Sequence, residues 1–135
     1  MSLITWNDSY SVKVKQMDDQ HKKLIDIINH LHDAMKAGKG KEAVNKVMTD
    51  LVAYTKTHFA TEESLMKLHA YPGYDDQKKA HSALVTQVAD IHKKFEAGNA
   101  PLSQDVMSFL KDWLVKHIQG TDKKYGPFLN EKGVV

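Results

Sequence analysis

Four stretches of this chain carry apolar side chains at alternating three- and four-residue steps, which is the spacing of one face of an α-helix. We predict helices over about residues 18–37, 41–69, 74–97 and 102–119. Each stretch ends at a helix breaker, namely Gly38 and Gly40, Tyr71-Pro72-Gly73, residues 98–101, and Gly120. Helices joined by such short loops run antiparallel to their neighbours. The predicted fold is therefore all-α, an up-down-up-down antiparallel four-helix bundle.

The segments outside the four helices are short. The chain has 135 residues, which is the size of one domain. We predict a single domain over residues 1–135, with an extended N-terminal arm over 1–16, the bundle over 17–120 and a tail over 121–135. The arm is expected to pack across the bundle, and the tail to carry a short C-terminal helix at about residues 122–129.

The composition excludes several classes of protein. The chain has no cysteine, so it has no disulfide, iron–sulfur cluster, thiolate zinc site or c-type haem attachment. The net charge is only +2 and the lysines are scattered, which argues against a nucleic-acid partner. The sequence shows no signal peptide and no apolar run approaching about 18 residues, so we expect a cytoplasmic protein with no membrane partner.

Polar side chains occupy several positions where a core residue is expected. Together with polar residues close to the helix ends, they form a set of seven: His21, His58, Glu62, Gln77, His81, His117 and Asp122. In an up-down bundle, the starts of the first and third helices lie beside the ends of the second and fourth, so all seven are expected at one end. His58 with Glu62, and Gln77 with His81, are also four residues apart and share a helix face. Buried polar groups are costly unless something satisfies them, and a metal ion can satisfy this many.

The same side chains indicate the kind of metal site. Imidazoles with carboxylates suit iron, manganese or zinc. Six or seven donors are too many for one tetrahedral zinc, but they suit two six-coordinate ions. Glu62 and Asp122 are the natural bridges, because a carboxylate can bind one metal with each oxygen. Outside this set, we expect Glu63 to face solvent or to support a ligand, and we expect four histidines on the surface: His30, His32, His69 and His92.

Several segments of the chain resemble one known family. They are Trp6-Asn7, Asp19-Gln20-His21-Lys22, Asn29-His30-Leu31, His58-Phe59-Ala60-Thr61-Glu62-Glu63, Tyr71-Pro72-Gly73-Tyr74, His81, Trp113-Leu114-Val115-Lys116-His117-Ile118, Asp122 and Tyr125-Gly126-Pro127. These segments extend over nearly the whole chain, and those around His58 and His117 are highly specific together. In them the chain is similar to the hemerythrin family, in particular to its single-domain bacterial form, bacteriohemerythrin.

The resemblance implies two iron ions (Fe2+/Fe3+) with an oxo or hydroxo bridge. It implies that one iron is bound by His21 and His58, the other by His81 and His117, and both by Glu62 and Asp122. The first iron would keep an open position for dioxygen or a small anion, in a protein that we expect to be a monomer. An apolar wall beside that position would consist of Trp113, Leu24, Ile25 and Leu114, which are equally candidates for ordinary core residues.

The chain departs from the family pattern at Gln77, where the family places a third histidine on the second iron. Three explanations stay open: the amide oxygen is a weak ligand, water fills the position, or the residue was introduced to probe ligation. The leading function is oxygen carriage, storage or sensing by a binding protein with no catalytic residue. The alternatives are a di-iron peroxidase- or oxidase-like enzyme and an iron-handling protein, both favoured by a more open iron.

Overall fold

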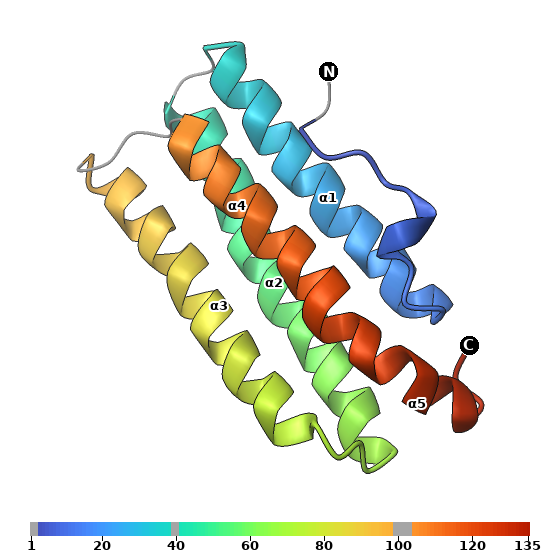
Figure 1. The fold of residues 1–135 in the computed structure, drawn as a ribbon. Helices are drawn as coiled ribbons and strands as arrows, with labels where there is room; N and C mark the ends of the chain where they lie inside the picture. Colours follow the sequence, from blue (N-terminus) through green and yellow to red (C-terminus); the bar gives the residue numbers. More distant parts are fainter. Residues whose placement is uncertain (1–2, 39–40, 99–103) are drawn as a thin grey trace.

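The computed structural model describes residues 3–38, 41–98 and 104–135 of the chain. Four long helices lie side by side: α1 (Lys15–Lys36), α2 (Lys41–Leu68), α3 (Tyr74–Glu96) and α4 (Gln104–Lys116). Consecutive helices run in opposite directions (Figure 1), and the described residues form no β-strand. The predicted all-α, up-down-up-down bundle is confirmed. The breakers predicted at Gly40 and residues 99–101, and the helix start predicted at residue 102, lie outside the described residues.

Helix α1 begins at Lys15, earlier than the sequence predicts. Its N-cap is Val14, whose side chain cannot accept a hydrogen bond, so no capping residue marks the start. The carboxylate of Asp18 in the first turn instead accepts hydrogen bonds from the backbone N–H of Val12 (2.8 Å) and the hydroxyl of Ser11 (2.6 Å). These two bonds fasten the end of the arm to the helix that follows it.

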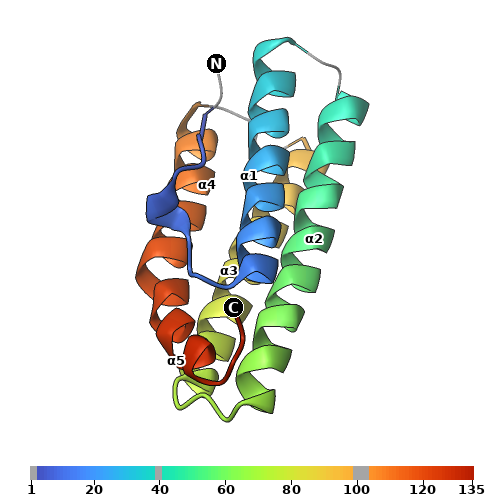
Figure 2. The ribbon, with the colours of Figure 1, turned by 90° about the vertical axis from the view of Figure 1, so that its right-hand side faces the viewer.

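The N-terminal arm lies along the bundle between α1 and α4 (Figure 2). Asn29 of α1 holds it in place, because its side chain accepts from the backbone N–H of Ile4 and donates to the C=O of Ile4, both at 2.8 Å. The arm is extended apart from one 3-10 turn, η1 (Asp8–Tyr10). An arm that packs across the bundle is therefore present, but the predicted residues 15 and 16 belong to α1.

The chain does not leave its helical path at Gly120, where we predicted a stop. Helix α4 passes into a π-helical turn, η2 (His117–Thr121), then a 3-10 turn, η3 (Asp122–Lys124), and finally α5 (Tyr125–Glu131). The backbone N–H of Asp122 bonds to the C=O of His117, five residues back, as in a π-helix. The predicted short C-terminal helix is confirmed, although it begins at Tyr125. Among the helices of the described residues, none is both long and apolar enough to cross a bilayer.

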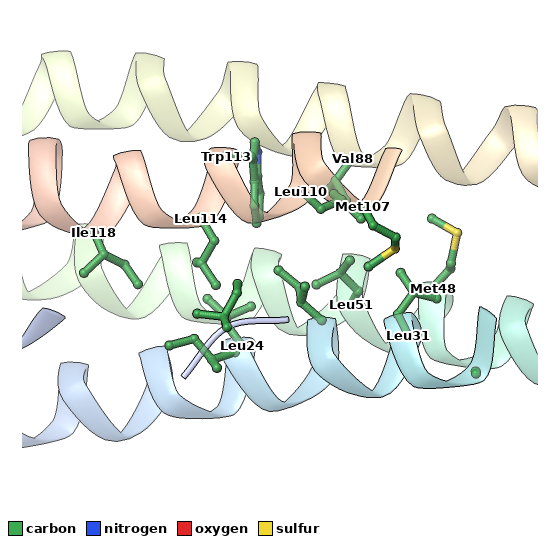
Figure 3. Close-up of a cluster of buried hydrophobic side chains, with 14 of the residues drawn as sticks. Leu24, Leu31, Met48, Leu51, Val88, Met107, Leu110, Trp113, Leu114 and Ile118 are labelled. Atoms are coloured by element: carbon green, nitrogen blue, oxygen red, sulfur yellow. The ribbon is translucent and has the colours of Figure 1, made fainter. Parts of the chain in front are cut away.

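The main core fills the space between the helices (Figure 3). The sequence predicts an apolar face on α4 made of Val106, Phe109, Leu110, Trp113 and His117. The structure corrects it, because Phe109 is 41% exposed, whereas Met107 and Leu114 are buried with Leu110. Residues 107, 110 and 114 form a stripe that faces the bundle, and residue 109 lies about 200° around the helix from residue 107, so the Phe109 side chain points away from that stripe. A second correction concerns His32 of α1, which is buried and not on the surface.

A second, smaller core closes the end of the bundle where α1 begins and α2 ends. It joins the arm, the start of α1, the end of α2 and α5, and its buried members are Val12, Val14, Met17, Met66, Tyr125 and Leu129. Gly126 lies at the tightest point of this contact, because a Cβ atom there would collide with the carbonyl oxygen of Val12. Only glycine allows the arm and α5 to approach this closely.

The variant Gly126→Ala is expected to lower the free energy of unfolding by about 1–3 kcal/mol, because the added methyl group forces the arm away from α5. Gly120→Ala is the matched control, since its Cβ would meet nothing within 4 Å. That control should keep or slightly raise stability. Urea denaturation of the metal-free proteins measures both. Equal stabilities for the two variants would contradict the close contact between Gly126 and Val12.

Candidate metal centre

The seven predicted donors lie at the end of the bundle closed by the smaller core. They are His21 on α1, His58 and Glu62 on α2, Gln77 and His81 on α3, His117 in η2 and Asp122 in η3. Each of them is no more than 5% exposed. The four imidazoles approach the two carboxylates through their Nε2 atoms, so the structure brings these six side chains together as the sequence predicts.

Glu62 lies at the middle of the cluster. Its Oε1 atom is 3.1 Å from Nε2 of His58, 3.4 Å from Nε2 of His81 and 3.7 Å from Nε2 of His117. Its Oε2 atom is 3.7 Å from Nε2 of His21. One carboxylate therefore faces imidazoles from all the helices that contribute a histidine.

Asp122 spans the same centre from the other side. Its Oδ2 atom is 2.9 Å from Nε2 of His21, and its Oδ1 atom is 3.0 Å from Nε2 of His117. The π-helical turn makes this possible. In an α-helix, residues five apart point about 140° away from each other, since each residue turns about 100°. The wider turn from His117 to Thr121 removes most of that angle, so His117 and Asp122 face the same point.

The short distances in the cluster are not well-formed hydrogen bonds. The buried atoms that have no hydrogen-bond partner include Oε1 of Glu62, both oxygens of Asp122, and Nε2 of His21, His58, His81 and His117. Buried polar atoms are rarely left unpaired in native proteins. Nitrogen and oxygen atoms that converge on a common space without well-formed hydrogen bonds to one another are the arrangement that a metal ion requires.

The donors form two overlapping sets. One is His21, His58, Glu62 and Asp122, and the other is Glu62, His81, His117 and Asp122. Within each set, the candidate ligand atoms all lie within 4.8 Å of one another. Because both sets contain the same two carboxylates, the cluster can hold two metal ions that share Glu62 and Asp122. The residues present therefore fit the binuclear site that the sequence predicts.

Two histidines are oriented by partners on their outer nitrogen. Nδ1 of His58 donates to Oε1 of Gln20 at 2.6 Å, and Nδ1 of His81 donates to Oε2 of Glu63 at 2.9 Å. A proton fixed on Nδ1 leaves the Nε2 lone pair free to bind a metal, and such outer partners commonly tune metal ligands. Glu63 thus supports a ligand, one of its two predicted roles. Gln20, which is half-buried, was missed because nothing in its spacing pairs it with His58.

Tyr125 is a further residue of the site that sequence reasoning missed. Its buried hydroxyl donates a hydrogen bond to Oε2 of Glu62. Burial, and then the charges of Glu62 and Asp122, raise the pKa of Tyr125 well above its ordinary value, so the phenol keeps its proton. Tyr125 lies within one of the segments that resemble hemerythrins, but no periodicity points it at Glu62.

The two carboxylates hold protons on two of the imidazoles in the metal-free protein. Burial lowers the pKa of His21, but Asp122 and Glu62 outweigh it and raise the pKa to about 9. The same balance, dominated by Asp122 once burial is overcome, raises the pKa of His117 to about 10. Burial opposes the charge on Glu62, yet the imidazoles around it hold its pKa well below the usual range. The centre is therefore built to surround positive charge with two carboxylates.

The remaining predicted residues fall into three groups. The four residues of the proposed apolar wall, Leu24, Ile25, Trp113 and Leu114, are all buried in the main core. Of the histidines predicted on the surface, His30 is exposed, while His69 and His92 are half-buried. Gln77 is buried, and its side-chain NH2 donates to the backbone carbonyl of Thr121 at 2.9 Å.

Comparisons with known proteins agree with this geometry. A family model described as the hemerythrin HHE cation binding domain matches residues 12–129. The chain is 40% identical to bacteriohemerythrin of Methylococcus capsulatus, over 96% of this chain and 99% of that protein. It is 32% identical to myohemerythrin of Theromyzon tessulatum, over 89% of this chain and 88% of that protein. A crystal structure of wild-type hemerythrin superposes with a TM-score of 0.86 at 40% identity, covering 93% of this chain and 97% of that one. The chain therefore belongs to the hemerythrin family, as its sequence motifs predict.

Proposed function

We propose that this protein is a non-haem di-iron protein that binds dioxygen reversibly, as a carrier, store or sensor. The observation that carries the proposal is the pair of four-residue donor sets that share Glu62 and Asp122. Imidazole and carboxylate donors without thiolates suit iron. A pair of ferrous ions supplies a position for dioxygen and the electrons that it accepts on binding.

In this proposal His21 and His58 hold one iron, and His81 and His117 hold the other. Glu62 and Asp122 would be shared by the two ions, together with an oxo or hydroxo group. Two imidazoles and two shared carboxylates would leave coordination positions unfilled on either iron, and the iron held by His21 and His58 would offer one of them to dioxygen or a small anion. Tyr125 keeps the bridging carboxylate of Glu62 in place through its hydrogen bond.

The open position would lie on the side of His21. Leu24 and Ile25 follow His21 by one helical turn and are buried, as are Trp113 and Leu114 of α4. These buried side chains would help to exclude water from a metal held by His21 and His58. A dry, apolar surrounding disfavours the separation of charge, and so favours release of neutral dioxygen over loss of a charged product.

We further propose that the protein acts as a monomer in the cytoplasm. Among the described residues, the exposed large apolar side chains are Leu68, Phe109 and Val135, which belong to α2, α4 and the C-terminus. Single exposed apolar residues of this kind are normal on monomers. The lack of cysteine is compatible with a reducing compartment.

The test is a spectrum of the anaerobic, iron-loaded and reduced protein before and after oxygen is admitted and then pumped away. Oxygen binding that reverses when the pressure falls supports the proposal. Turnover of peroxide with a reductant over many cycles would instead identify an enzyme. An enzyme is the second candidate because the chain has Gln77 where the family pattern has a histidine. His21→Ala should abolish the oxygen response, while His30→Ala, which changes an exposed histidine, should leave it intact.

A further inference from the structure

We propose that the side-chain oxygen of Gln77 is a ligand of the metal held by His81 and His117, and that the Thr121 carbonyl fixes its orientation. The proposal rests on the binuclear site proposed above and adds to it. It selects between the alternatives for a position where the family pattern has histidine. It also predicts that the two metal positions differ in affinity.

The first observation is an unpaired buried atom. Gln77 is 3% exposed, and its Oε1 atom has no hydrogen-bond partner, although an amide oxygen has two lone pairs to satisfy. Leaving a buried acceptor unpaired carries the full cost of removing it from water. Gln77 is four residues before His81 on α3, so both side chains leave the same face of the helix. The unpaired oxygen therefore lies on the side of the bundle from which His81 reaches the metal centre.

The second observation fixes which end of the amide is which. The NH2 group of Gln77 donates to the backbone carbonyl of Thr121 at 2.9 Å. Reversing the amide would set two acceptor oxygens at that distance, with no proton between them. The hydrogen bond therefore selects the orientation in which Oε1 points away from Thr121 and is free for a cation.

The third observation links this contact to the rest of the centre. Thr121 is the last residue of the π-helical turn that begins at His117, and Asp122 follows it directly. The same turn thus aims His117 and Asp122 at the centre and supplies the carbonyl that orients Gln77. A ligand held in this way needs no outer carboxylate of the kind that orients His81.

The chemistry of the donor sets the expected behaviour. An amide oxygen is a neutral, hard donor and binds iron or cobalt more weakly than an imidazole nitrogen does. The His81–His117 position should therefore bind its metal more weakly than a third histidine would allow, but more tightly than two histidines and two carboxylates alone. Removal of the oxygen should weaken the second metal equivalent and leave the first unchanged.

The experiment is an anaerobic titration of the full-length metal-free protein with Co2+, followed by visible absorption and calorimetry. The unmodified protein should bind two equivalents. Gln77→Leu should bind the second at least tenfold more weakly, in line with the roughly 10–100-fold that even an outer partner contributes. Gln77→Glu, which keeps an oxygen donor, should retain it, and Gln77→His should change the absorption of the second Co2+ because nitrogen replaces oxygen. Gln87→Leu, an exposed change on the same helix, should match the unmodified protein.

The outcomes separate the two proposals. Two equivalents bound with unchanged affinities by Gln77→Leu would overturn the role of Gln77 and leave the binuclear site standing. Fewer than two equivalents bound by the unmodified protein would overturn both. If circular dichroism shows that Gln77→Leu does not fold, Gln77→Met supplies the same comparison with a flexible side chain of similar length. Loss of the second equivalent in that variant supports the proposal, and its full retention overturns it.

Discussion

Replacing Glu62 with glutamine should abolish binding of the metal pair. The Glu62 carboxylate lies 3.1–3.7 Å from the Nε2 atoms of the four histidines of the centre, whereas Asp122 reaches only two of them. An amide has one oxygen to offer instead of two and carries no charge. Its NH2 group would also point N–H donors toward atoms that must keep their lone pairs for a metal.

We expect Glu62→Gln to bind one metal ion per chain or none, instead of two. The metal affinity should fall by about 100-fold or more, because loss of a residue that only hydrogen-bonds to a ligand already costs up to about 100-fold. Metal analysis after dialysis, together with Co2+ titration, measures this. Glu42→Gln is the matched control, because Glu42 is an exposed glutamate at the other end of the same helix. That variant should keep two ions. A Glu62→Gln protein that still binds two would show that Glu62 does not bridge them.

Metal affinity should depend steeply on pH. The pKa values of His21 and His117 are about 9 and about 10 in the metal-free protein, so both imidazoles are protonated at neutral pH. A metal binds only the neutral imidazole, so binding must displace both protons. The affinity for the two metal ions should therefore rise about 100-fold for each pH unit up to about pH 9, and binding should release about two protons.

The metal-free fold should show the opposite trend. Both histidines have folded-state pKa values above their ordinary value of 6.5. Their contribution to the free energy of unfolding is therefore fully present below pH 6.5 and is lost as the pH rises through about 9 to 10. The metal-free protein should lose stability over that interval while the metal-loaded protein does not.

Both trends are measurable with the same samples. Proton release is measured with a pH indicator in weakly buffered solution during Co2+ addition, and stability by thermal unfolding across the pH range. The variant His30→Ala, at an exposed position of α1, is the control and should behave as the unmodified protein. An affinity that is the same at pH 7 and pH 8, with no protons released, would contradict the pairing of His21 and His117 with Asp122.

The sequence predicts the helices best where breakers surround them. The predicted limits 41–69 and 74–97 are within one residue of α2 (Lys41–Leu68) and α3 (Tyr74–Glu96), because glycine and proline residues separate these helices. The start of α1 was misplaced because Val14 is not a capping residue. The π-helical turn was missed for a different reason: its wider winding is a local exception to the periodicity on which the prediction depends.

The same distinction holds for the site. Four histidines and two carboxylates were predicted at one end of the bundle, because the up-down topology alone determines which helix ends lie together. The contacts of Tyr125 with Glu62, and of Gln20 with His58, depend on how the side chains of separate helices meet. The first pair is separated by 63 positions in the chain and the second by 38, and a single sequence contains no pattern that indicates such distant contacts. Phe109 shows the same limit in the core, since two neighbouring faces of α4 are both apolar.

The most direct measurement is an anomalous difference map from crystals of the iron-loaded protein. Two iron peaks are expected in the space between the four imidazoles, one beside His21 and His58 and one beside His81 and His117, with Glu62 and Asp122 in contact with both. A single peak, or iron bound anywhere outside these six side chains, would contradict the binuclear site.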